Sequence, residues 1–277
     1  MISKNQAKLI RQLEQKKFRR REGLFVAEGP KVVGDLLSAG FLPHTIFATT
    51  EWMNENPDAG TGKRGALSRD NVTLPVTEVS DEELRKVSFL QHPQQVLALF
   101  RLPERAAGFC PTEAPLPSPD ALCLALDGVQ DPGNLGTIIR IADWFGIDTI
   151  YCSEDTSDAW NPKVVQATMG SIARVNIFYT SLHDLISQAA VPVYGTLLDG
   201  DNIYTQPLSK GGIIVMGNEG NGISPEIRPL VTHRLLIPAF RQGDTAESLN
   251  VAIATAITCS EFRRRTNKFH TVLDPKG

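Results

Sequence analysis

Apolar positions in the first hundred residues switch between strand-like runs and helical spacing. Runs at residues 24–27, 45–48 and 96–100 predict three buried strands. Helical spacing over residues 32–37 predicts a helix that Gly40 ends. These elements indicate a small α/β domain that contains no recognisable catalytic constellation.

Polar segments complete this N-terminal part. Its first residues predict one basic helix, and residues 53–71, rich in Asn, Gly, Asp and Arg, predict a surface insertion. Ser80 with Glu83 three residues later predicts a helix start, because the two side chains can cap the first backbone amides.

Beyond residue 120, strands and helices alternate. The continuous apolar run 122–126 predicts a strand buried on both faces. Further strands are expected at residues 149–152, 175–178, 191–198, 213–216 and 234–238. Helices are expected over 135–145, near Lys163, Leu182 and Pro225, and over about 248–264. The pattern predicts a mostly parallel sheet with helices on both faces, whose ligand site lies beyond the carboxyl ends of the strands.

Four prolines between residues 104 and 120 mark a composition break, since proline-rich segments form extended connectors. We therefore expect a domain over residues 1–103, a linker over 104–120 and a second domain over 121–277.

Composition narrows the class of protein. The 277 residues are 42% apolar and 21% charged, which is typical of a soluble globular protein. No apolar run approaches the roughly 20 residues of a membrane span, and no secretory signal is visible at the start. The four scattered cysteines predict reduced thiols in a cytoplasmic protein, and neither they nor the five histidines suggest a metal site.

Charge is unevenly distributed along the chain. Residues 1–31 hold nine basic and three acidic side chains, a net charge of +6, which leaves −9 on the rest of a chain whose total is −3. A basic segment on an acidic body is typical of polyanion binding, although a solvated helix face explains such a run equally well. The residues predicted to bind RNA are Lys16, Lys17, Arg19, Arg20 and Arg21.

Three loops follow predicted strands. In the first, residues 127–140, Asn134 can cap the following helix, and Arg140 between two isoleucines either snorkels to solvent or binds an anion. The second, residues 217–224, places three glycines around Glu219 and is either a ligand loop or a tight turn. The third runs from Ile237 to the start of the last helix, where Ser248 or Asn250 can act as a cap.

Taken in order, these loops resemble the three motifs of the SpoU (TrmH) family of RNA ribose 2′-O-methyltransferases. The matching segments are Asn134-Leu135-Gly136 with Arg140, Gly217-Asn218-Glu219-Gly220-Asn221-Gly222, and Ile237-Pro238 with Ser248-Leu249-Asn250. Residues 23–29 are similar to the L30e-like RNA-binding domain that many members carry.

The resemblance implies a C-terminal trefoil knot, a homodimer and S-adenosylmethionine as cofactor. The positions that match the family's cofactor-binding residues are Thr196, Leu197, Leu198, Gly217, Asn218, Gly220, Ile237 and Leu249. Those that match its catalytic and supporting residues are Arg140, Asn134, Glu219, Ser248 and Asn250. The loop over residues 240–245 looks longer than in many members.

Alternatives remain at this point. Arg140 is either the general base or, because a guanidinium stays protonated in proteins, a clamp for phosphate and the developing alkoxide. Ribosomal RNA is favoured over transfer RNA as substrate, and a non-catalytic RNA-binding or ribosome-assembly factor is the main rival function. A nicotinamide enzyme is disfavoured, since the loop after the first C-terminal strand lacks the dinucleotide glycine pattern.

Overall fold

The computed structural model describes residues 1–57, 76–103, 114–241 and 248–265. Most of the predicted insertion and part of the predicted linker therefore lie outside the described residues. Contacts between residues divide the chain into two compact units. The first comprises Met1–Glu113, Gln130–Arg140 and Ser157–Phe178, and the second Ala114–Val129, Ile141–Thr156 and Tyr179–Gly277.

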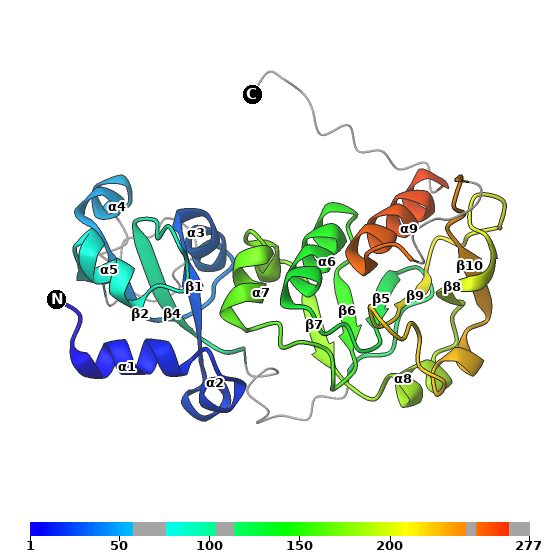
Figure 1. Ribbon diagram of the computed structural model, residues 1–277, viewed down its shortest axis with the longest axis horizontal. Coiled ribbons are helices and arrows are strands. Elements are labelled where there is room, and N and C mark those ends of the chain that lie inside the picture. Colours follow the sequence, from blue (N-terminus) through cyan, green and yellow to red (C-terminus); the bar gives the residue numbers. More distant parts are fainter. Residues whose placement is uncertain (58–75, 104–113, 242–247, 266–277) are drawn as a thin grey trace, which may run out of the picture. The chain divides into compact units, whose positions relative to one another are not determined.

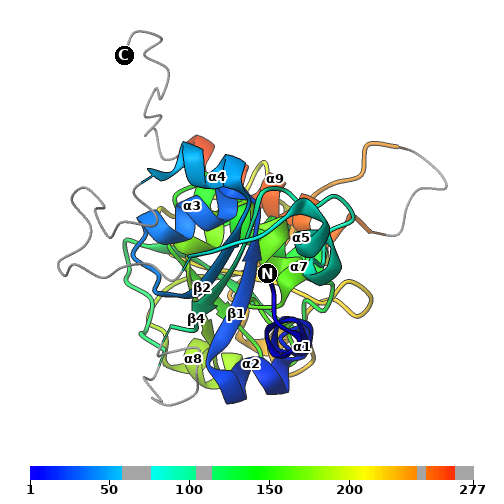
Figure 2. The ribbon, with the colours of Figure 1, turned by 90° about the vertical axis from the view of Figure 1, so that its left-hand side faces the viewer.

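The first unit contains a four-stranded sheet in the order β1-β4-β2-β3, and Figure 2 shows β1, β4 and β2 side by side. Its strands are β1 (Leu24–Glu28), β4 (Val96–Arg101), β2 (Pro43–Ala48) and β3 (Val76–Glu78). β4 pairs antiparallel with both β1 and β2, whereas β2 and β3 are parallel. The three strands predicted from sequence are confirmed, and the short edge strand β3 was missed.

Five helices from the described part of residues 1–103 accompany this sheet: α1 (Lys4–Gln12), α2 (Lys16–Glu22), α3 (Pro30–Ser38), α4 (Thr50–Glu55) and α5 (Asp81–Val87). Ser80 caps α5 with Glu83, as predicted. The prediction of a single basic helix was wrong. The segment forms two helices, because α1 ends at the fully buried Leu13 and the chain turns before α2. The helix α4 was also missed, and its last three residues were assigned to the start of the insertion.

Both faces of the sheet are covered, since successive strand residues point to opposite sides. Ile10 and Leu13 near α1 and Leu84 of α5 pack against Val26 and Leu99 on one face. On the other side, α3 packs against β1 and β4, and Figure 2 shows α3 and α1 on opposite sides of the strands.

A segment from the middle of the chain completes the first unit. The helix α7 (Pro162–Ala167) packs against β1, and the Trp160 ring lies 4.7 Å from that of Phe25 and 6.1 Å from that of Phe41. The N-terminal sheet thus buries apolar surface against residues that lie far along the sequence.

Arg19 has a structural role that sequence analysis did not foresee. Its side chain is 2% exposed, forms an ion pair with Asp158, and donates to the carbonyls of Leu13 at 2.7 Å and Glu14 at 2.8 Å. The RNA-binding role predicted for Arg19 is wrong, because all of this hydrogen bonding faces inward.

The second unit is built on a six-stranded sheet in the order β10-β8-β9-β5-β6-β7 (Figure 1). The strands are β5 (Leu122–Leu126), β6 (Thr149–Cys152), β7 (Asn176–Tyr179), β8 (Val193–Asn202), β9 (Gly212–Met216) and β10 (His233–Leu236). The pairs β10/β8, β8/β9, β9/β5 and β5/β6 are parallel. The predicted parallel sheet is therefore confirmed, with strand ends shifted by a few residues.

Helices α9 (Val251–Arg265) and α8 (Leu182–Gln188) lie on opposite sides of this sheet (Figure 1). The helix predicted near Pro225 is replaced by turns and a short 3-10 helix over Arg228–Leu230. The apolar spacing of Leu249, Ala252, Ile253, Ala256 and Ile257 predicts that these residues form the core face of the last helix. This is wrong in part: Leu249 is 50% and Ile253 53% exposed, whereas Thr255, Thr258 and Cys259 are buried.

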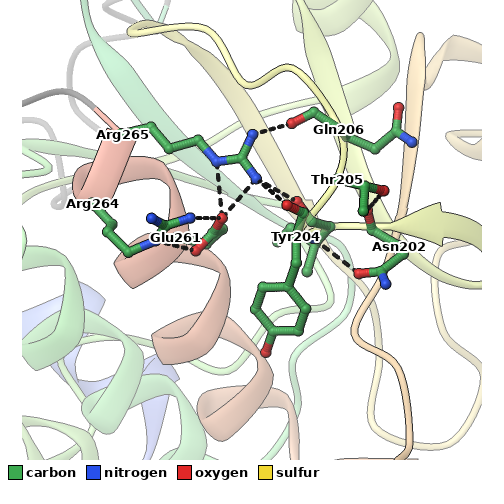
Figure 3. Close-up of polar contacts among 8 residues, drawn as sticks. Asn202, Tyr204, Thr205, Gln206, Glu261, Arg264 and Arg265 are labelled. Carbon is green, nitrogen blue, oxygen red and sulfur yellow. Dashed lines mark hydrogen bonds and ion pairs between the residues drawn. The ribbon is translucent and has the colours of Figure 1, made fainter.

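The end of α9 is anchored by a charged cluster (Figure 3). Glu261 is buried and accepts hydrogen bonds from both Arg264 and Arg265. Arg265 also donates to the carbonyl of Tyr204 at 2.7 Å and to that of Gln206. The last helical turn is thereby tied to the segment that follows β8.

The described cysteines Cys123, Cys152 and Cys259 are free and buried, whereas Cys110 lies outside the described residues. Burial raises the pKa of Cys123 to about 11 and that of Cys259 to about 12, so both thiols stay protonated near neutral pH. None of the helices in the described part of the chain is long and apolar enough to cross a membrane.

Replacing Arg19 with Met should lower the free energy of unfolding by about 3–5 kcal/mol, since it leaves the Asp158 carboxylate without its partner. Urea denaturation measures this loss. The matched change Arg20→Met, at an exposed neighbour, should stay within about 0.5 kcal/mol of the unchanged protein. Equal losses in the two variants would contradict the buried role of Arg19.

Candidate active site

The side chain of Asn218 shapes the loop that follows β9. Its Oδ1 accepts hydrogen bonds from the amides of Gly220 at 2.9 Å and Asn221 at 3.0 Å. Its backbone N–H donates to the carbonyl of Gly222, and its carbonyl accepts from the Gly222 amide, both at 2.9 Å. These bonds close the loop into a tight hairpin and leave Glu219 exposed at its tip.

Asn218 and Asp127 join this loop to the loop that follows β5. The Asn218 Nδ2 donates to the carbonyl of Gly128 at 2.7 Å, and the Asp127 Oδ2 accepts from the amide of Ser224 at 2.7 Å. β5 and β9 are parallel neighbours, so both loops leave the same edge of the sheet. At the carboxyl edge of the sheet, the loop after β5 and the loop after β9 are therefore held together by hydrogen bonds.

Asp127 is a site residue that sequence analysis did not single out. It is 8% exposed and follows directly after the fully buried strand β5. A carboxylate at the end of such a strand is the signal that could have found it, since a buried charge needs hydrogen-bond donors.

Gly217 is required by the space around it. A Cβ at this position would lie 2.2 Å from the carbonyl carbon of Gly222, which no side chain tolerates. This glycine allows the two arms of the hairpin to approach each other, so Gly217 itself has a structural reason.

The predicted cofactor-binding positions on β8 differ in exposure. The Thr196 Oγ1 lies 3.6 Å from the Met216 Sδ on β9, Leu197 is buried, and Leu198 is 75% exposed. Three more of the predicted cofactor-binding positions lie in the loop after β9. Of the last two, Ile237 directly follows β10 and Leu249 lies two residues before α9. Exposed apolar side chains such as Leu198 and Leu249, together with the backbone groups of loops, fit the adenosine part of the expected cofactor.

Asn250 caps α9. Its Oδ1 accepts from the amides of Ala252 at 2.9 Å and Ile253 at 3.2 Å, so one of the two caps left open by the sequence is confirmed. Ser248 lies two residues earlier and is exposed. Any functional role of Asn250 is thus combined with a structural one.

The helix α6 (Pro132–Trp144) carries the first motif. The cap predicted at Asn134 is wrong: Asp131 is the cap, and its Oδ1 accepts from the Asn134 amide at 2.8 Å. Pro132 can occupy the first helical position because its missing N–H needs no partner there. Gly136 permits close contact with α7, since a Cβ there would lie 2.4 Å from that of Ala167.

Arg140 lies on the exposed side of α6. Among the residues that the structure describes, none accepts a hydrogen bond from its guanidinium. Arg140 and Asn134 fall in the first unit, whereas Glu219, Ser248 and Asn250 fall in the second. In the described ranges, no group of three or more His, Cys, Asp or Glu side chains could hold a metal ion.

Replacing Asn218 with Ala should weaken S-adenosylmethionine binding roughly tenfold or more, because three hydrogen bonds that hold the two loops disappear. Isothermal titration calorimetry measures the affinity. Asn221→Ala is the matched control, since the Asn221 contact to Asn218 uses its backbone amide. The same affinity in both variants would show that the Asn218 side chain is not what orders the binding loops.

Comparison with known proteins places this geometry in a family. The model of the SpoU rRNA Methylase family matches residues 121–260, and that of the MRM3-like substrate binding domain matches residues 4–98. The chain is 30% identical over 266 residues to the 23S rRNA (guanosine(2553)-2′-O)-methyltransferase RlmP of Bacillus subtilis, covering 94% of this chain and 97% of that protein.

Solved structures agree with these matches. A protein of the TrmH family from Porphyromonas gingivalis is 41% identical with a TM-score of 0.78, over 96% of this chain and 99% of that one. An AdoMet-bound rRNA methyltransferase from Sinorhizobium meliloti is 33% identical with a TM-score of 0.80, over 97% of this chain and 98% of that one. The chain therefore belongs to the SpoU rRNA methylase family, and it is an S-adenosylmethionine-dependent RNA 2′-O-methyltransferase.

Proposed function

We propose that the chain methylates a ribose 2′-hydroxyl of ribosomal RNA, with the cofactor held by the joined loops beyond β5 and β9. The observation that carries the proposal is the pair of bridges, Asn218 to Gly128 and Ser224 to Asp127, which orders the carboxyl edge of a parallel sheet. Ribosomal RNA is favoured because the relatives from Bacillus subtilis and Sinorhizobium meliloti are named for that substrate.

Arg140 is proposed as the catalytic residue. When bound, S-adenosylmethionine supplies an activated methyl group, so the protein must position the ribose and assist loss of its hydroxyl proton. A guanidinium does not lose its proton in proteins, which favours a clamp over a general base. An exposed guanidinium with no acceptor among the described residues suits the phosphate next to that ribose and the developing alkoxide.

Asn134, Glu219, Ser248 and Asn250 are proposed as supporting residues on the family's pattern. Glu219 is exposed at the tip of the hairpin that Asn218 shapes, where it can reach a large ligand. Asn250 needs care in any experiment, because its substitution also removes the cap of α9.

The basic residues of α2 are proposed to bind the RNA backbone. Lys16, Lys17, Arg20 and Arg21 are exposed, whereas Arg19 is not. The Phe18 ring adds an aromatic surface, with Lys17 Nζ 4.9 Å and the Arg21 guanidinium 4.7 Å from its centre. Cations beside an aromatic ring are typical of surfaces that bind single-stranded RNA.

Two architectural expectations remain proposals. We assign residues 1–103 to an L30e-like RNA-binding domain, 104–120 to a linker and 121–277 to a methyltransferase domain with a C-terminal trefoil knot. The neighbouring family matches at 4–98 and 121–260 support these boundaries. The ties from Arg265 to the segment after β8 support a fixed path for the last helix.

A homodimer through the methyltransferase domain is also proposed. Trp144 is 84% exposed, Ile253 53% and Phe240 87%, and such large apolar side chains are commonly covered by a partner. Trp144 and Arg140 are four residues apart on α6 and thus share one face of that helix. A partner that covers Trp144 would therefore lie next to the proposed catalytic residue.

Replacing Arg140 with Ala should lower kcat about 100- to 1000-fold, because the developing alkoxide loses its cationic partner, and leave cofactor affinity unchanged. Methyl transfer from labelled S-adenosylmethionine to protein-free ribosomal RNA, and separately to transfer RNA, measures this. Arg85→Ala, at an exposed arginine of α5, is the control and should retain full activity.

Two results would contradict parts of this proposal. Label in transfer RNA alone would replace the substrate and keep the reaction, and full activity of Arg140→Ala would remove the catalytic role. Under the clamp, Arg140→Lys should keep the pH dependence of the rate, whereas complete loss of that dependence would favour a general base.

Replacing Trp144 with Asp should convert a dimer into monomers, because a charge buried in an apolar interface is strongly unfavourable. Light scattering after size-exclusion chromatography gives the mass. Leu42→Asp is the control, since Leu42 is 66% exposed on the first unit and should not affect association. A wild-type chain that is monomeric, or a Trp144→Asp variant that stays dimeric, would overturn this interface.

A further inference from the structure

The first unit contains a cavity of about 280 Å³ between β1, the segment that follows α5, and α7. Its apolar wall includes Phe89, Leu90 and Pro162, and its polar groups come from Glu28, Gln166 and Lys163. No residue predicted from the sequence to bind cofactor or RNA lines this cavity. Its volume is close to the lower end of small-molecule pockets, roughly 300 Å³, which suits a single planar ring system.

Gln166 lines this cavity and carries an unused hydrogen-bond acceptor. Its side-chain Oε1 is buried and, within the described part of the chain, has no hydrogen-bond partner. A buried acceptor without a donor costs about 1–3 kcal/mol, and folded proteins rarely keep one. A donor from outside the protein would remove this cost.

Glu28 supplies a second acceptor and also holds the wall. It is 6% exposed, and its carboxylate accepts from the Phe89 amide at 2.9 Å and from the Ser88 hydroxyl. Burial raises its pKa, while these hydrogen bonds oppose the shift. Two acceptors in an apolar pocket select a flat ligand that donates hydrogen bonds from its edge.

We propose that this cavity binds an unstacked nucleobase of the RNA substrate, whose exocyclic amino group donates to the Gln166 Oε1. The inference rests on the proposed function, since RNA is what brings a base to this surface. Bases splayed from RNA loops stack on aromatic rings and are read at their edges, which matches a wall containing Phe89. Lys163 is exposed and lines the same cavity, where its ammonium suits the phosphate attached to that base.

The acceptors also predict which bases bind. Adenine, cytosine and guanine carry an exocyclic amino group that can donate to Gln166. Uracil has no exocyclic amino group, and its single N–H lies between two carbonyl oxygens that are repelled by the Gln166 Oε1. The cavity should therefore discriminate against uracil.

Fluorescence anisotropy with oligoadenylate, oligocytidylate and oligouridylate of equal length tests this on the full chain. Oligoadenylate and oligocytidylate should bind about fivefold to tenfold more tightly than oligouridylate, as expected for one well-made hydrogen bond. Gln166→Met should abolish this preference and leave the affinity for S-adenosylmethionine unchanged. Gln188→Met, at an exposed glutamine of α8, is the matched control and should keep the preference.

Leu90→Trp provides a second variant in case the first disturbs folding, because an indole would fill the cavity. It should remove the base preference and retain the weaker binding to all three oligonucleotides. Equal binding of all three by the wild-type chain, or a preference that survives both variants, would overturn the nucleobase site. Methylation of ribosomal RNA by that same chain would then leave the proposed function standing.

Discussion

Buried parallel strands can present a binding site at their carboxyl edge only if the backbone beyond that edge is itself hydrogen-bonded. In this protein, the side chains of Asn218 and Asp127 supply most of the hydrogen bonds that this backbone needs. The carboxamide of Asn218 satisfies amides of its own loop and a carbonyl of the neighbouring one, and the carboxylate of Asp127 accepts from the Ser224 amide. The order of both loops, and with it the site proposed for the cofactor, depends on these hydrogen bonds.

The first unit shows the same dependence on contacts that are distant in sequence. Arg19 ties α2 to Asp158, and Trp160 packs on Phe25, so the segment that leads into α7 is part of the N-terminal core. Gly136 then brings α6 close to α7. The start of α6, which carries the first motif of the family, thereby packs within the same unit as the helix proposed to bind RNA.

Apolar periodicity misidentified the buried face of the last helix for a physical reason. Leu249 and Ile253 are exposed, while Thr255 and Thr258 are buried and donate their hydroxyls to helical carbonyls. Exposed apolar residues of the kind proposed to bind a cofactor or a second subunit are the same residue types as those of a core. Hydrophobic spacing alone therefore does not distinguish core residues from such binding residues.

Local sequence determined much of this protein. The continuous run 122–126 dictated a strand buried on both faces, Ser80 and Glu83 dictated the start of α5, and the three loops in their order identified the family. Such features depend on backbone geometry and on neighbours within a few residues, which a sequence displays directly.

Tertiary structure decided what depends on distant partners. The sequence contains five similar cations between residues 16 and 21, and only burial against Asp158 sets Arg19 apart. Asp127 gained its role from the Ser224 amide, and Gln166 from a cavity formed by three separated segments. Burial and hydrogen-bond satisfaction depend on residues brought together by the whole fold. The position of Asp127 directly after a buried strand is a local signal, but no local pattern could have revealed its Ser224 partner or the roles of Arg19 and Gln166.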